Sequence, residues 1–144
     1  MYINDVLKFE GEYLNGEKWK GKDYYHNGNI EFEGEFLNGI KFKGKGYNYS
    51  GKLEFEGEYL NGEMWNGIRR EYYYYNDELK FEGEYLNGKR WKGKGKEYNN
   101  SGKLIFDGEY LNGKKWNGKG IEYDDKGIIL YNYQYSNGEM TKLN

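Results

Sequence analysis

The amino-acid sequence predicts an all-β protein: one elongated, twisted antiparallel sheet of about six stacked β-hairpin repeats. Three observations support this prediction. A motif recurs at nearly constant spacing, the side chains of each copy alternate between two chemical types, and an Asn-Gly pair closes each copy. Such a period is typical of folds that stack one supersecondary unit on the next. One hairpin of this length cannot bury its own apolar face, so we expect the repeats to stack.

The motif consists of an aromatic residue, an acidic-Gly-Glu triplet and then aromatic-Leu-Asn-Gly. The copy at 81–88 reads FEGEYLNG. The last copy is degenerate, because Tyr133 replaces the motif glycine and Ser136 replaces the motif leucine, which suggests a capping repeat. The sequence therefore predicts a single repeat array over residues 1–144, with repeats that begin near Phe9, Phe32, Phe55, Phe81, Phe106 and Tyr131.

The side chains within each copy alternate between two faces, as those of a β-strand do. In the fourth copy Phe81, Gly83 and Tyr85 share one face, whereas Glu82 and Glu84 share the other. The Asn-Gly pair that follows accepts the positive φ of a tight hairpin turn. A second alternating segment, such as WKGKG, comes next. Each repeat is therefore predicted to be one hairpin with an aromatic face and a charged face.

The register of each hairpin is predicted from cross-strand chemistry, because opposite charges and paired aromatic rings are favourable neighbours. This register requires either a three-residue loop or a β-bulge just after the Asn-Gly turn. In the first hairpin it pairs Tyr13 with Trp19, Glu12 with Lys20 and Glu10 with Lys22. In the fourth hairpin it pairs Leu86 with Arg90, Tyr85 with Trp91, Glu84 with Lys92, Gly83 with Gly93, Glu82 with Lys94 and Phe81 with Gly95.

The composition excludes several classes of protein. The chain has no Cys, which rules out disulfide frameworks and thiolate metal sites. Its 22 basic residues nearly balance its 24 acidic ones, so we expect no nucleic-acid binding that depends on releasing phosphate counterions. No apolar run approaches the length of about 18 residues that crosses a bilayer, and the first residues do not resemble a signal peptide. We expect a cytoplasmic location.

Side chains capable of chemistry are present, but they do not form a recognisable constellation. His26 is the single histidine, and the chain has no Cys for it to activate. Glu82 and Glu84 recur in each repeat opposite Lys, which is typical of a surface charge ladder and not of two catalytic carboxylates. Asp124 and Asp125 lie in a polar turn without the alternating oxygen ligands of a calcium loop. We therefore expect no enzymatic activity, no catalytic residue, no cofactor and no metal site.

The third repeat departs from the motif in its second strand, where two adjacent arginines precede a run of tyrosines. Arg and Tyr are enriched where protein interfaces concentrate their binding energy. The alternative is a longer connector whose tyrosines pack on the neighbouring hairpin. The candidate partner-binding residues are Arg69, Arg70, Tyr72, Tyr73, Tyr74 and Tyr75.

The pattern of aromatic-x-Gly-x-aromatic, then Asn-Gly, then Gly-x-Gly resembles MORN repeats over nearly the whole chain. MORN repeats form a ladder of β-hairpins stacked into an elongated twisted sheet, so the resemblance implies this architecture. The string SGKLEFEGEYLNG at 50–62 also resembles a MORN variant of bacterial antitoxin-like proteins.

The resemblance also implies a class of function. It implies a noncatalytic scaffold for protein–protein interaction or self-association, in cytoskeletal or membrane-adjacent assemblies. A second reading that it implies is recognition of anionic phospholipid, although the pairing of Lys with Glu weakens attraction to an anionic surface. A third is an antitoxin or immunity protein that blocks an enzyme by docking on it.

Overall fold

A computed structural model of the chain describes residues 2–3, 6–89 and 92–143. These residues form β-strands, turns and connectors, and none of them is helical, which confirms the predicted all-β fold. Among them, the strands from β3 to β14 are hydrogen-bonded in chain order as six antiparallel hairpins, as predicted. The chain divides into two compact units, Met1–Ile68 and Arg69–Asn144.

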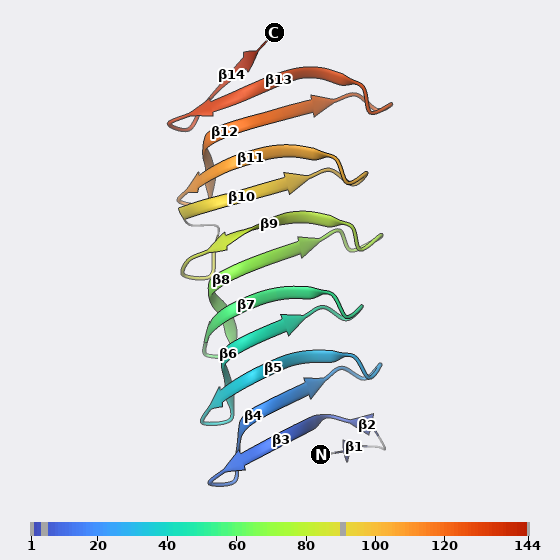
Figure 1. Cartoon of the computed structure of the whole chain (residues 1–144), viewed down its shortest axis with the longest axis vertical. Coiled ribbons are helices and arrows are strands. Elements are labelled where there is room, and N and C mark those ends of the chain that lie inside the picture. The colour runs from blue at the N-terminus through green and yellow to red at the C-terminus, as the bar shows by residue number, and fades with distance from the viewer. Residues whose placement is uncertain (1, 4–5, 90–91, 144) are drawn as a thin grey trace. The chain divides into compact units, whose positions relative to one another are not determined.

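The first unit is an antiparallel meander, in which each strand pairs with the next strand of the chain (Figure 1). Its sheet contains β3 (Phe9–Leu14), β4 (Glu17–Tyr24), β5 (Ile30–Leu37), β6 (Ile40–Tyr47), β7 (Leu53–Leu60) and the first part of β8 (Glu63–Tyr72). The short strands β1 (Tyr2–Ile3) and β2 (Val6–Leu7) pair only with each other in the described part of the chain.

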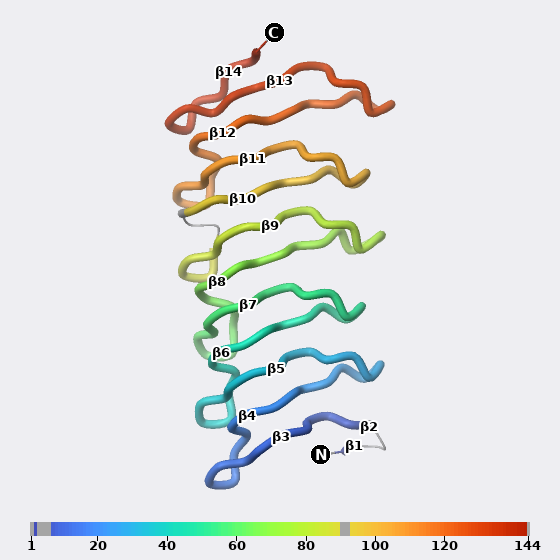
Figure 2. The backbone as a smooth tube through the Cα atoms, in the orientation of Figure 1, coloured from blue at the N-terminus to red at the C-terminus, as the bar shows by residue number. Residues whose placement is uncertain are grey.

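The second unit continues the same chain-order pairing. It contains the end of β8 and then β9 (Leu79–Tyr85), β10 (Lys92–Tyr98), β11 (Leu104–Leu111), β12 (Lys114–Tyr123), β13 (Ile129–Ser136) and β14 (Glu139–Leu143). In each unit the Asn-Gly turns lie at one side of the sheet and the longer connectors at the other, as the backbone trace shows (Figure 2).

Each hairpin closes on a two-residue turn because Asn and Gly both adopt a positive φ there. In the first hairpin Asn15 has a φ of 53° and Gly16 a φ of 81°. Leu14 pairs directly with Glu17 across this turn. Two positive φ values in succession match the right-handed twist of the flanking strands, which favours a tight turn over a longer loop. The Asn-Gly signal therefore selects the two-residue loop.

A β-bulge follows the turn and corrects one predicted pair. The register of the first hairpin shifts between Glu12 and Tyr13, so that Trp19 is the extra residue and Tyr13 lies opposite Lys18. The predicted pairing of Tyr13 with Trp19 is therefore wrong, because the two-residue turn leaves one residue too many on the second strand. The same shift occurs in the second and fifth hairpins. Beyond the bulge, two predicted pairs are confirmed: Glu12 with Lys20 and Glu10 with Lys22.

The fourth hairpin has a register that differs from the predicted one by two residues. Gly83 pairs with Gly95 and Phe81 pairs with Glu97, so the predicted partners Gly93 for Gly83 and Gly95 for Phe81 are wrong. Glu82 likewise pairs with Lys96 and not with Lys94. Leu86 pairs with Lys89 across the turn, so the predicted partner Arg90 for Leu86 is wrong. The predicted partner of Tyr85, Trp91, lies outside the described residues.

The pairing of β10 with β11 is shifted in the same way, with Gly95 opposite Gly108, and here the length of β10 is the reason. Tyr98 pairs with Leu104 at the connector, just as Tyr24 pairs with Ile30 in the first unit. The sequence places two more residues between Gly93 and Tyr98 than between the corresponding glycine and tyrosine of β4. Because the pair of Tyr98 with Leu104 is kept, the glycine of β10 that faces β11 is two positions closer to the connector: Gly95 in place of Gly93. An even shift keeps every side chain on its face.

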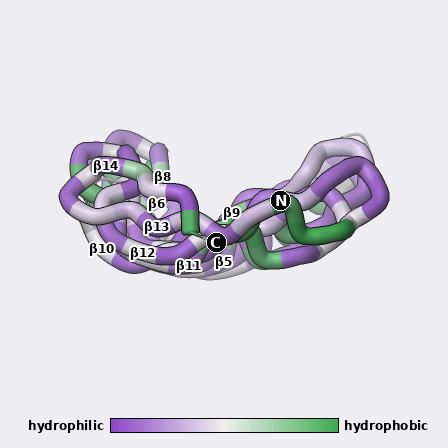
Figure 3. Tube along the Cα trace, turned by 90° about the horizontal axis from the view of Figure 1, so that it is seen from above, coloured by the Kyte–Doolittle hydropathy of each residue, from purple (hydrophilic) through white to green (hydrophobic). Residues whose placement is uncertain are grey.

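The core is a chain of aromatic rings on one face, here called the aromatic face. In the first unit Phe9, Phe32 and Phe55 are fully buried. Phe36 bridges the first two rings in edge-to-face contacts, with its centroid 5.6 Å from Phe9 and 5.2 Å from Phe32. Most residues along the Cα trace are hydrophilic, and hydrophobic residues occur only in short stretches (Figure 3). In the second unit the buried rings are Phe81, Phe106, Tyr110 and Tyr133.

The motif glycines are required because the rings and the neighbouring backbone lie close to them. A Cβ atom on Gly21 would lie 2.8 Å from Cζ of Phe9 and 2.8 Å from Cα of Gly11. Both distances are far below ordinary van der Waals contact. The regular spacing of glycine in the sequence therefore follows from the packing of the Phe rings onto bare backbone.

Candidate functional site

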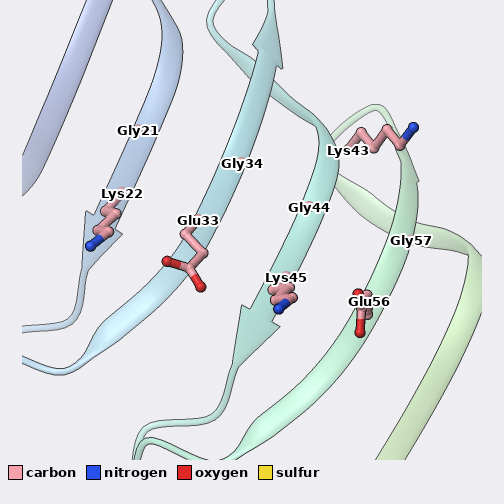
Figure 4. Close-up of a pocket in the computed structure, with 9 residues that line it drawn as sticks. All are labelled: Gly21, Lys22, Glu33, Gly34, Lys43, Gly44, Lys45, Glu56 and Gly57. Atoms are coloured by element: carbon pink, nitrogen blue, oxygen red, sulfur yellow. The ribbon is translucent and has the colours of Figure 1, made fainter.

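The glycines of the first unit form a continuous row across neighbouring strands. Gly21 of β4 pairs with Gly34 of β5, and Gly34 pairs with Gly44 of β6. Gly44 in turn pairs with Gly57 of β7. On the face opposite to the aromatic rings, the backbone of this row forms the floor of a shallow groove of about 530 Å³, which Lys and Glu side chains flank (Figure 4).

A ladder of alternating charges lies along each side of the glycine row, on the face here called the charged face. Lys22, Glu33, Lys45 and Glu56 follow one another on consecutive strands, as the close-up shows (Figure 4). Each charge has an opposite charge as its cross-strand neighbour, which is a favourable arrangement. The result is a polar surface with little net charge. The second ladder consists of Lys20, Glu35, Lys43 and Glu58.

Apolar side chains are exposed at the turn ends of the first three hairpins. We call this set the tip row. By alternation along the strand, Leu37 lies on the charged face, and Ile40 lies directly opposite it. Leu37 is 58% exposed and Ile40 is 50% exposed. The tip row comprises Leu14, Trp19, Leu37, Ile40, Phe42 and Leu60, which are all more than one-third exposed.

The β-bulge explains why aromatic side chains are exposed in the tip row. It turns Lys18 onto the aromatic face, where its Nζ lies 5.0 Å from the centroid of Phe9 and forms an ion pair of 2.8 Å with Asp23. The bulged residue Trp19 stays exposed, with Nζ of Lys20 lying 4.4 Å from a Trp19 ring centroid. Phe42 is the bulged residue of the second hairpin and is 46% exposed.

The connector tyrosines attach neighbouring elements to the ladders. The hydroxyl of Tyr47 donates a hydrogen bond of 2.6 Å to Oε1 of Glu33. Burial, together with this hydrogen bond to Glu33, raises the pKa of Tyr47 to about 12. The hydroxyl of Tyr25 donates to the backbone carbonyl of Tyr47 at 2.7 Å. These contacts join the end of β6 to β5 and to the connector that follows β4.

The predicted partner-binding arginines lie on opposite faces of β8. The Cζ atom of Arg69 lies 5.5 Å from the ring centroid of Tyr85, so this side chain packs on the aromatic face. Nε of Arg70 forms an ion pair of 3.2 Å with Glu82, whose side chain belongs to the charged face. Adjacent strand residues must point to opposite faces, so the structure does not bring these two arginines together.

The predicted partner-binding tyrosines also divide by environment. Tyr72 is half-buried at the end of β8. The hydroxyl of Tyr73 donates to the backbone carbonyl of Tyr98 at 2.8 Å, and burial raises its pKa. Tyr74 is 96% exposed and Tyr75 is 55% exposed. Tyr73 thus packs on the neighbouring connector, whereas Tyr74 and Tyr75 remain on the surface.

The side chain of Asp124 binds the backbone of its own polar turn. Oδ1 of Asp124 accepts hydrogen bonds from the N–H groups of Lys126 and Ile128. Within residues 2–3, 6–89 and 92–143, His, Asp and Glu side chains form no group of three suited to a metal ion. In the same ranges no helix has the length and apolar character needed to cross a bilayer.

The tip row is a candidate site that the sequence reasoning missed. Its signal was present, because the motif leucine follows two acidic residues on the face opposite to the buried rings in each full copy. An apolar residue on a charged face has no core to enter. A search of family models, curated proteins and solved structures finds no match for this chain. The resemblance to MORN repeats therefore depends on the repeated motif itself.

Proposed function

We propose that this chain is a noncatalytic repeat scaffold of the MORN type, which binds a protein partner or a second copy through the tip row. One observation carries the proposal. Leu37, Ile40 and Phe42 expose about half of each side chain beside an almost neutral pair of charge ladders. An exposed apolar cluster with a polar rim is the usual composition of a protein-binding surface.

The charge pattern ranks a protein partner above a phospholipid surface. An anionic membrane attracts unpaired basic residues. In the first unit, however, Lys22 and Lys45 each lie opposite Glu33, and Lys20 and Lys43 lie opposite Glu35. Positive and negative side chains therefore alternate from each strand to the next along the ladders. An antitoxin or immunity protein is one form that such a protein-binding scaffold takes.

Affinity capture from the native source tests this proposal with two matched variants. Leu37→Ser/Ile40→Ser/Phe42→Ser removes the centre of the tip row, and Tyr74→Ser/Tyr75→Ser removes the exposed tyrosines of the connector. We expect the first variant to lose the captured protein and the second to retain it, while both keep the circular dichroism spectrum of the wild type. Sedimentation of the purified chain measures self-association in the same variants.

Undiminished capture by the tip-row variant contradicts the proposal. Binding to anionic vesicles, measured in parallel, separates the two classes of partner. If wild-type protein binds such vesicles, captures no protein and does not self-associate, the scaffold proposal gives way to phospholipid recognition. If the captured protein is an enzyme that the chain inhibits, the antitoxin form of the proposal is supported.

A further inference from the structure

We propose that the outer edge of β3 is a second binding site, which accepts an extended basic-Gly-basic segment of a partner as an additional antiparallel strand. This inference rests on the proposed protein-binding function and names a partner chemistry for a different surface. Addition of a strand to a sheet edge uses main-chain hydrogen bonds for affinity and side-chain pairs for specificity.

The backbone of β3 offers hydrogen-bonding groups at this edge. Within the described residues, β3 is the end strand of its sheet and pairs with β4 on one side. The N–H of Tyr24 donates to the carbonyl of Lys8 at 3.0 Å, which makes this a hydrogen-bonded pair of the β3–β4 ladder. Alternation along the strand then directs the N–H and C=O groups of Gly11 and Tyr13 away from β4. Both residues are exposed.

The other strands of the first unit define which sequence this edge accepts. In β5, the segment Glu33-Gly34-Glu35 lies between two basic strands: Lys20-Gly21-Lys22 of β4 and Lys43-Gly44-Lys45 of β6. The strand β7 repeats the pairing, with Glu56-Gly57-Glu58 opposite the basic segment of β6. In each case glycine faces glycine and each Glu faces a Lys.

The strand β3 carries the same acidic segment but meets only one basic strand. Its residues Glu10, Gly11 and Glu12 pair with Lys22, Gly21 and Lys20 of β4. In β5 the corresponding acidic segment has a Lys-Gly-Lys strand on each side. The outer side of the β3 segment has the same residues and no such strand in the described part of the chain. An incoming strand in the β4–β5 register therefore places its glycine opposite Gly11 and its two basic residues opposite Glu10 and Glu12.

The same charges disfavour pairing of β3 with β3 of a second copy. An antiparallel pair with Gly11 opposite Gly11 brings Glu10 of one copy opposite Glu12 of the other, and this happens twice. Like charges directly opposite each other destabilise a sheet pair. Charged residues on an edge strand are a common protection against such self-pairing. The edge thus rejects its own sequence and selects a basic segment.

Two peptides taken from this chain test the selection directly. The peptide IKFKGKGY corresponds to Ile40–Tyr47 and carries the basic segment, whereas IEFEGEFL corresponds to Ile30–Leu37 and carries the acidic one. They have equal length and the same strand character but opposite charge. With fluorescently labelled peptides and the full chain, we expect the basic peptide to bind at least about tenfold more tightly than the acidic one, as two added cross-strand charge pairs allow.

A charge-reversed variant identifies the edge. In Glu10→Lys/Glu12→Lys the preference should reverse, so that the acidic peptide becomes the better ligand. The amide signals of Gly11 and Tyr13 in the unaltered protein should shift and gain protection from hydrogen exchange when the basic peptide binds. This measurement needs no substitution, so it remains decisive if the variant unfolds. Equal affinity of the two peptides, or binding that leaves both amides unchanged, overturns the inference.

The outcome is separable from that of the proposed function. The tip-row variant Leu37→Ser/Ile40→Ser/Phe42→Ser leaves β3 intact and should bind the basic peptide normally. Capture of a partner through the tip row, combined with no peptide binding, overturns the β3 inference alone. Peptide binding at β3 combined with unchanged capture by the tip-row variant overturns the tip-row proposal and supports the β3 site.

Discussion

The ring of Tyr59 meets the ring of Phe32 at a right angle, with their centroids 5.1 Å apart. Tyr59 also contacts Phe55 of its own strand at 5.3 Å. The motif tyrosine of one repeat thus packs between its own phenylalanine and that of the preceding repeat. Edge-to-face pairs of this kind stabilise beyond the area that they bury. The core of the first unit therefore forms between repeats, which explains why a single hairpin is insufficient.

Substitution of two phenylalanines on neighbouring strands tests this description of the core. Phe32 is fully buried, whereas Phe42 is 46% exposed. We expect Phe32→Ala to lower the free energy of unfolding by about 3 to 5 kcal/mol, the usual cost of removing a buried ring. Phe42→Ala should cost under about 1 kcal/mol, as surface substitutions do. Urea unfolding of both variants measures the difference, and equal losses would refute the assigned faces.

A pair of glycines tests the close approach of the strands. A Cβ on Gly34 would collide with the carbonyl oxygen of Lys43 and lie 2.7 Å from Cα of Gly44. Gly28 lies in a connector with no heavy atom within 4 Å of its Cβ position. We expect Gly34→Ala to cost about 3 kcal/mol or more because backbone must move. Gly28→Ala should cost about 1 kcal/mol, which is the penalty of a positive φ.

Thermal unfolding of these two glycine variants provides the comparison. The positive φ of Gly28 makes its substitution a demanding control, since that variant is also strained. A melting temperature that falls equally in both variants would mean that the strands do not approach at Gly34 as described.

The position of Lys18 offers a test from within the repeats themselves. Lys18 lies over the rings of Phe9 and Phe36, and Met64 occupies the corresponding position of the third repeat. Lys18→Met should therefore change the free energy of unfolding by less than about 1 kcal/mol, because Met packs well on aromatic rings. Lys18→Glu should cost about 1 to 2 kcal/mol, since it loses the cation–π contact and places a second acid beside Asp23. Chemical denaturation distinguishes the two outcomes, and a larger loss for Met than for Glu would oppose this assignment.

Alkaline pH should destabilise the fold through Tyr47. Its pKa is about 12 in the folded chain, against an ordinary value of 10.0. Below pH 10 the hydroxyl is neutral in both states, so its contribution to stability is fully present. As the pH rises from 10 to 12, the unfolded chain releases this proton first, so the free energy of unfolding falls. Tyr47→Phe should make the decline less steep, as measured by urea unfolding across this pH window; an unchanged slope would contradict the assignment.

The sequence is sufficient to predict the strands, their two faces and the Asn-Gly turns, because these depend on local periodicity and on backbone preferences. It fails for the pair of Tyr13 with Trp19, because turn geometry overrides the chemistry of side-chain pairs there. It also fails for the register of Gly83. The length of β10 does not explain this shift, because β12 has the same spacing between glycine and tyrosine and still pairs Gly118 with Gly108, the counterpart of the predicted pair.

The candidate site is harder to predict than the fold. Composition directs attention to Arg69 and Arg70, but strand alternation places them on different faces. The exposure of Leu37 and Phe42 depends on the two-residue turn and on the bulge that follows it. Residue composition predicts neither the turn geometry nor the bulge, although the Asn-Gly pair can be read in the sequence. The exposure of a side chain at a hairpin tip is therefore determined by the strand register of the folded hairpin.

The central claim is that the tip row of the first unit is a protein-binding surface. Hydrogen exchange of the chain, alone and in complex with its captured partner or as its own oligomer, tests this claim most directly. The claim predicts new protection in the segment 35–43, which contains Leu37, Ile40 and Phe42, with no change at Tyr74 and Tyr75. Protection confined to the connector at 72–76, with unchanged exchange in 35–43, would contradict it.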